Sequence, residues 1–126
     1  MEVDEGKRGA GRLSVRLKPD VNAPAAARRA LRDLPLGERA DDVLLLASEL
    51  VTNAVLHAGL GPDEPIELEV AFDDSCAHVE VRDTGAGFAH VPRAGHGLRI
   101  VEATTDRWGI EHDGKTRVWF DVPIAG

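Results

Sequence analysis

Two neighbouring segments of the chain alternate between apolar residues and mostly charged or polar ones, and this pattern constrains the fold more than any other feature. The apolar positions are Ile66, Leu68, Val70 and Phe72 in the first segment, and Ala77, Val79 and Val81 in the second. A period of two is typical of a β-strand with one buried and one solvated face. The Asp-Asp-Ser turn signal at 73–75 predicts that the segments form a hairpin. A doubly wound parallel sheet is disfavoured, because its strands are apolar on both faces.

The remaining segments complete an ordered set of elements. Further strands are predicted at 12–18, 107–111 and 116–122. Helices are predicted at 22–34 and at 98–104, and a longer one begins between Gly37 and Asp42 and ends before Gly59. The predicted order is strand, helix, helix, strand, strand, helix, strand, strand. Because the strands have one polar face, we expect a two-layer α/β (α+β) sandwich, in which helices cover one face of a mostly antiparallel mixed sheet.

Composition limits the number of domains and the kinds of partner. The 126 residues fit one domain, expected at 11–126 after a disordered, Gly-rich segment at 1–10. A net charge of −7 and 4% aromatic residues argue against nucleic acid as a partner. We expect neither a signal peptide nor a membrane span, and one cysteine permits no intramolecular disulfide, so a cytoplasmic location is predicted. The composition leaves open whether the chain forms a homodimer.

The long predicted helix carries a polar stripe. Glu49, Asn53 and His57 are spaced four residues apart, so they lie on one side of the helix, beside its apolar face. A solvated stripe of an ordinary amphipathic helix explains the same spacing.

Strand alternation also predicts where two polar residues point. Asp83 follows Val81 with the same parity, and Thr116 shares the parity of Val118, so both are expected on the helix-covered face. A buried carboxylate needs a hydrogen-bond donor from the protein or from a ligand, such as an exocyclic amine. The alternative is an Asp that caps a turn containing Gly85 and Gly87, and a Thr that simply begins a strand.

Two glycine-containing motifs remain. Gly95-His96-Gly97-Leu98 precedes a predicted helix, where exposed N–H groups would suit phosphate oxygens, although a plain flexible loop has the same composition. Residues 109–116 match the P-loop pattern G-x-x-x-x-G-K-[ST]. We reject that interpretation, because a strand follows the motif and Asp113-Gly114 is typical of a hairpin turn.

Taken in order, Glu49-x-x-x-Asn53, Asp83-x-Gly85-x-Gly87, Gly95-x-Gly97-Leu98 and Thr116 resemble the boxes of the GHKL (Bergerat-fold) ATPases, the gyrase, heat-shock chaperone and histidine-kinase type. Residues 48–58 resemble in particular the anti-sigma-factor serine/threonine kinases and their actinobacterial relatives. The resemblance implies ATP or ADP and Mg²⁺ as ligands. It assigns Glu49 as general base, Asn53 to Mg²⁺ and Asp83 to the adenine amine. Nucleotide contacts are implied for Gly85, Gly87, Gly95, His96, Gly97, Leu98 and Thr116, and a γ-phosphate contact for Arg28 or Arg29.

The resemblance implies a kinase that phosphorylates an antagonist protein and sequesters a sigma factor. An alternative is a non-catalytic, nucleotide-dependent regulator that holds a protein partner, because only residues 88–94 separate the second and third boxes and Arg93 is their one strongly basic residue. A third hypothesis is the ATPase domain of a split histidine kinase. It is less favoured, because no dimerisation helix with a phosphoacceptor His is expected before the domain.

Overall fold

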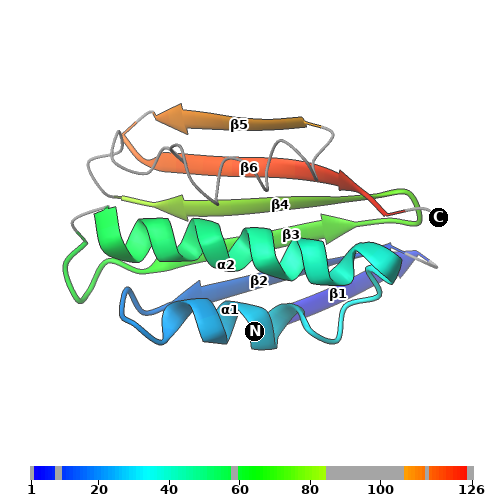
Figure 1. The fold of residues 1–126 in the computed structure, drawn as a ribbon, viewed down its shortest axis with the longest axis horizontal. Helices are drawn as coiled ribbons and strands as arrows, with labels where there is room; N and C mark the ends of the chain where they lie inside the picture. Colours follow the sequence, from blue (N-terminus) through cyan, green and yellow to red (C-terminus); the bar gives the residue numbers. More distant parts are fainter. Residues whose placement is uncertain (1, 8–9, 58–59, 85–106, 113, 125–126) are drawn as a thin grey trace.

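The computed structural model describes residues 2–7, 10–57, 60–84, 107–112 and 114–124 (Figure 1). In these ranges the elements are β1 (Glu2–Lys7), β2 (Ala10–Leu17), α1 (Ala23–Leu31), a 3₁₀ turn (Gly37–Arg39), α2 (Ala40–His57), β3 (Ile66–Phe72), β4 (Cys76–Asp83), β5 (Arg107–His112) and β6 (Thr116–Pro123). The predicted helix at 98–104 lies outside the described residues.

The strands form a six-stranded sheet in the order β1-β2-β3-β4-β6-β5. Every described pairing is antiparallel. Both α-helices lie on the same face of this sheet (Figure 1). The predicted two-layer α/β sandwich with helices on one face is therefore confirmed.

The predicted hairpin is strands β3 and β4, which pair with Val70 opposite Val79. The apolar residues of both strands are buried, as the alternation predicts. They pack beneath α2, whose buried side comprises Val43, Leu46, Ala47, Leu50, Val51 and Ala54. The side chains that recur every two residues in the strands and every 3.6 residues in the helix thus pack into a single core.

The N-terminal segment differs from the sequence prediction. Instead of the disordered stretch expected at 1–10, the structure has strand β1, which pairs antiparallel with β2. An edge strand needs only main-chain N–H and C=O groups to pair, so it forms without the alternating apolar residues on which the prediction depended. The lower boundary of the domain stays a prediction.

The first helix is shorter than predicted. It ends at Leu31 rather than Leu34, and the Leu34 N–H donates to the Leu31 carbonyl at 3.1 Å in the turn that follows. Leu31 itself is fully buried. The chain leaves the helix directly after its last core contact.

The helix-free face of the sheet carries a network of charged side chains centred on Glu80. Glu80 is only 5% exposed. Its carboxylate contacts Arg117 Nη1 at 2.8 Å, Arg82 Nη1 at 3.2 Å and His78 Nε2 at 3.2 Å. His78 Nδ1 lies 2.5 Å from the Asp121 carboxylate. The Glu80 carboxylate, which no helix covers, is thus shielded from solvent by the basic side chains that contact it.

Candidate functional site

Two polar residues lie inside the core at one end of the sheet. Asp83, the last residue of β4, is 3% exposed, and Thr116, the first residue of β6, is 1% exposed. The two are directly opposite each other in the β4–β6 register. They continue the buried rows of Val81 and Val118, so the prediction that both face the helix layer is confirmed.

The stripe on α2 lies beside the buried side of the helix. Glu49 and Asn53 are both half-buried and are one helical turn apart. Helix α2 packs against β4. Figure 1 shows that the C-terminal end of α2, the end of β4 and the start of β6 lie at the same end of the molecule. His57 ends α2, but its side chain is outside the described part of the structure.

A carboxylate that the sequence did not single out lies next to Asp83. Glu64, in the loop between α2 and β3, accepts hydrogen bonds from the Gly61 N–H and from Thr84 Oγ1, each at 2.8 Å. These bonds lower the pKa of Glu64, while the negative charge of Asp83 acts in the opposite direction. No local pattern marks Glu64, because its partner Thr84 is 20 residues further along the chain.

Other predicted site residues are not brought to this place by the described structure. Gly85, Gly87, Gly95, His96, Gly97 and Leu98 lie outside the described residues. Arg28 and Arg29 are exposed on α1, which packs against α2 and β2. Figure 1 shows α1 over the β1–β2 side of the sheet, away from β6. Neither arginine forms an ion pair within the ranges given above.

The P-loop match is a β-hairpin. Gly109 lies within β5, Thr116 begins β6, and the two strands pair antiparallel, with His112 opposite Thr116. Gly114 has a positive φ of 72°, which glycine adopts without strain and which suits a tight turn. The rejection of a phosphate-binding P-loop at 109–116 is confirmed, because this segment has no helix after its glycines.

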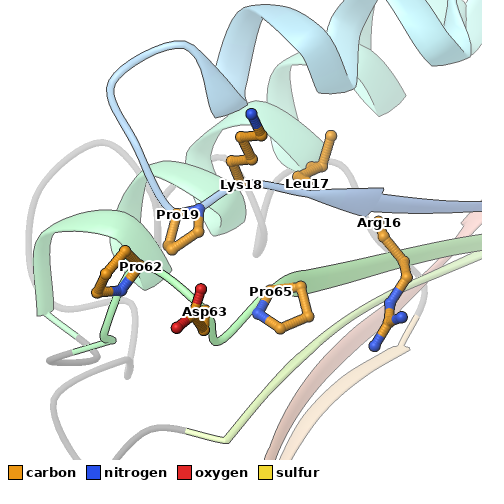
Figure 2. A pocket seen from close by; sticks show the side chains of 7 residues that line it. All are labelled: Arg16, Leu17, Lys18, Pro19, Pro62, Asp63 and Pro65. Carbon is orange, nitrogen blue, oxygen red and sulfur yellow. The ribbon is translucent and has the colours of Figure 1, made fainter.

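A shallow cavity of about 250 Å³ lies between the end of β2 and the loop that precedes β3 (Figure 2). Its lining residues are Arg16, Leu17, Lys18, Pro19, Pro62, Asp63 and Pro65. None of the residues predicted for the site lines this cavity. Its loop side, however, is formed by neighbours of Glu64 in the sequence.

Within the described residues, no helix is both long and apolar enough to cross a membrane. The predicted cytoplasmic location stays a prediction.

A family model described as "Histidine kinase-like ATPase domain" matches residues 17–121. This range contains every residue that the sequence predicts for the site. The match agrees with the resemblance to GHKL ATPases, which was based on four separate motifs in their order along the chain.

Three curated proteins similar to this chain are each named "Anti-sigma F factor". The protein from Geobacillus thermodenitrificans (strain NG80-2) is 29% identical over 77 residues, which are 60% of this chain and 53% of that protein. Those from Geobacillus sp. (strain WCH70) and Geobacillus stearothermophilus are 26% and 27% identical, with the same coverage. The chain therefore spans about half the length of the curated relatives it matches.

Proposed function

Because the chain belongs to the histidine kinase-like ATPase domain family, we propose that it binds ATP between α2 and the end of the sheet where β4 finishes and β6 begins. The observation that carries this proposal is the buried pair of Asp83 and Thr116 on the helix-covered face. Buried polar side chains need hydrogen-bond partners, which other groups of the protein and a bound ligand can both supply.

The hydrogen-bonding groups of Asp83 and Thr116 fit an adenine ring. A carboxylate has about four acceptor positions, so Asp83 can accept a hydrogen bond from an exocyclic amine in addition to bonds within the protein. A hydroxyl both donates and accepts, so Thr116 is suited to a ring nitrogen, directly or through water. Val81 precedes Asp83 on β4 and Val118 follows Thr116 on β6, and both are buried apolar residues of the kind against which flat rings pack.

The stripe on α2 fits the phosphate end of the nucleotide. The side-chain oxygen of Asn53 is a neutral, hard ligand suited to the Mg²⁺ that accompanies ATP phosphates. Glu49, one turn earlier, is placed to accept a proton from an attacking hydroxyl. We propose that Gly85, Gly87, Gly95, His96, Gly97 and Leu98 frame the nucleotide, and that Arg28 or Arg29 reaches the γ-phosphate.

We further propose that the chain transfers the γ-phosphoryl group of ATP to a serine or threonine hydroxyl of an antagonist protein, and that it also binds a sigma factor. The name shared by the similar proteins supports the sigma-factor partner. Glu49 and Asn53, one turn apart on α2, support the phosphoryl transfer. Phosphoryl transfer depends mostly on positioning and charge stabilisation, which are the roles proposed for Glu49 and for Asn53 with its Mg²⁺.

The experiment is to incubate the protein with labelled ATP, Mg²⁺ and candidate antagonist domains. Transfer is expected with the wild type and with Asp41→Ala, a matched control that removes an exposed carboxylate from the same helix. Transfer should be lost in Glu49→Ala. Unchanged transfer in Glu49→Ala would contradict the role of Glu49 as base. Tight ATP binding without transfer to any partner would instead support the non-catalytic, nucleotide-dependent regulator.

A further inference from the structure

Glu64 connects the loop before β3 to the first residue after β4. Its two carboxylate oxygens are used separately: Oε1 accepts from the Gly61 N–H and Oε2 accepts from the Thr84 hydroxyl, both at 2.8 Å. The Glu64 N–H also donates to the Gly61 carbonyl at 3.0 Å. One side chain therefore closes the turn of its own loop and also fastens the chain directly after Asp83.

The loop that carries Glu64 has little conformational freedom. Pro62 and Pro65 flank it at two residues before and one residue after, and each proline fixes its own φ near −65°. Figure 2 shows both prolines on the loop side of the shallow cavity. The backbone of such a loop loses less entropy than an unrestricted one when Glu64 forms a fixed hydrogen bond.

The position next to Asp83 also has an electrostatic consequence. The two hydrogen bonds lower the pKa of the Glu64 carboxyl, and the negative charge of Asp83 raises it by a smaller amount. The carboxylate of Asp83 favours a ligand that presents a hydrogen-bond donor to it, such as an amine. It disfavours a ligand that presents a carbonyl oxygen at the same place.

We propose that Glu64 is a positioning residue for adenine recognition, which acts by holding Thr84 and therefore the end of β4 that carries Asp83. The inference rests on the proposed nucleotide-binding function. It assigns to the loop between α2 and β3 a role that neither the motifs nor the family match attributes to it.

The test compares ATP with ITP, whose base carries a carbonyl oxygen in place of the adenine amine. Calorimetric Kd values for Mg-ATP and Mg-ITP are measured for the wild type, Glu64→Ala and Thr84→Val. The hydrogen bond between Thr84 and Glu64 is exposed to solvent, so the expected loss in ATP affinity is modest, roughly three- to tenfold. ITP affinity should change by less than about twofold, because ITP has no exocyclic amine to donate to Asp83 in any variant.

Two controls accompany this measurement. Thr84→Ser keeps the hydroxyl and should restore wild-type ATP affinity. Asp63→Ala removes the neighbouring carboxylate, which forms no hydrogen bond or ion pair within the described part of the chain, and should leave both affinities unchanged. The double variant of Glu64→Ala with Thr84→Val should bind ATP no more weakly than Glu64→Ala alone, because Glu64→Ala already removes the bond to Thr84.

The possible outcomes separate this inference from the proposed function. Equal losses for ATP and ITP would overturn it, because a merely structural residue lowers both affinities. Unchanged ATP affinity in Glu64→Ala and Thr84→Val, with normal binding by the wild type, would also overturn it and leave the proposed function standing. A wild-type protein that binds neither nucleotide would reject the proposed function and this inference together. Thr84→Val decides the question if Glu64→Ala fails to fold.

Discussion

Asp83 and Thr116 lie opposite each other across the β4–β6 pair, and both side chains are almost completely buried. Asp83 ends the buried row of β4, and Thr116 begins the buried row of β6. On these two strands, the helix-covered face is therefore polar only where the two residues meet. The same end of the molecule carries the C-terminal end of α2, with Asn53 one turn from Glu49 (Figure 1). This juxtaposition is the structural basis for placing a nucleotide here.

Replacing Thr116 by Val keeps the side-chain shape and removes only the hydroxyl. We expect ATP affinity to fall by about 0.5–1.5 kcal/mol, the net value of one neutral hydrogen bond. Calorimetry with Mg-ATP measures this change, and thermal unfolding without nucleotide checks that the variant folds. An affinity equal to that of the wild type would remove the Thr116 hydroxyl from the site.

Replacing Glu80 by Gln should destabilise the fold. Glu80 lies between Arg82 and Arg117, which are opposite each other in the sheet, so the neutral amide leaves two like charges side by side. We expect a loss of about 1–3 kcal/mol in the free energy of unfolding, measured by urea denaturation.

The matched control for Glu80 is Glu69→Gln. Glu69 is more exposed, and its carboxylate contacts Arg82 at 3.7 Å. Its loss should cost less than about 1 kcal/mol, as is usual for partly solvated ion pairs. Equal effects of the two substitutions would contradict the central position of Glu80 in the network.

Gly11 is required by a close approach in the sheet. A Cβ atom at Gly11 would lie 2.6 Å from Cζ of Phe72, whose side chain is buried on the facing strand. Gly11→Ala should therefore destabilise the protein by about 1–3 kcal/mol, as other overpacking substitutions do. Arg12→Ala, at the exposed next position, should stay within about 0.5 kcal/mol of the wild type. Similar urea midpoints for both variants would contradict the predicted clash.

Stability should fall at acidic pH, partly through Asp73 in the turn between β3 and β4. Its Oδ1 atom accepts from the Ser75 N–H, the Ser75 hydroxyl and the Cys76 N–H at 2.7–2.9 Å, and these bonds lower its pKa. A lowered folded-state pKa gives stability that is present above the unfolded value, about 3.9 for Asp, and is lost as the pH falls through the folded value.

The measurement is the urea midpoint between about pH 6 and pH 2.5, a window that covers the ordinary Asp and Glu values and the lowered folded ones. Asp73→Asn should flatten the decline relative to the wild type. Ser75→Ala removes one of the three hydrogen bonds and should flatten it in part. The pKa of Glu64 is lowered in the same direction, so Glu64→Gln should act similarly. An unchanged slope in Asp73→Asn would refute this account.

Most of the sheet could be predicted from local periodicity. The strands with one apolar face were located correctly, and parity placed Asp83 and Thr116 on the buried side before any tertiary contact was known. Periodicity has this power because adjacent side chains of a strand must point to opposite faces. The same logic distinguished the hairpin of β5 and β6 from a P-loop.

Features that depend on contacts distant in the sequence were missed. Strand β1 pairs through its main chain and shows no alternation, and its segment was expected to be disordered. Glu64 becomes part of the candidate site only because folding brings Thr84 to it. The exit from α1 at Leu31 is decided by packing rather than by the later Pro35. Such features are set by tertiary structure, which no window of sequence contains.

The most direct test of nucleotide binding at the β4–β6 end is a calorimetric titration of the wild type and Asp83→Asn with Mg-ATP. The substitution keeps the size of the side chain and removes the charge that we propose accepts the adenine amine. We predict that the wild type binds and that Asp83→Asn binds more weakly by roughly 1.5–3 kcal/mol, the scale of a hydrogen bond to a charged group. Equal affinities for the two proteins, or no binding by the wild type, would contradict the account.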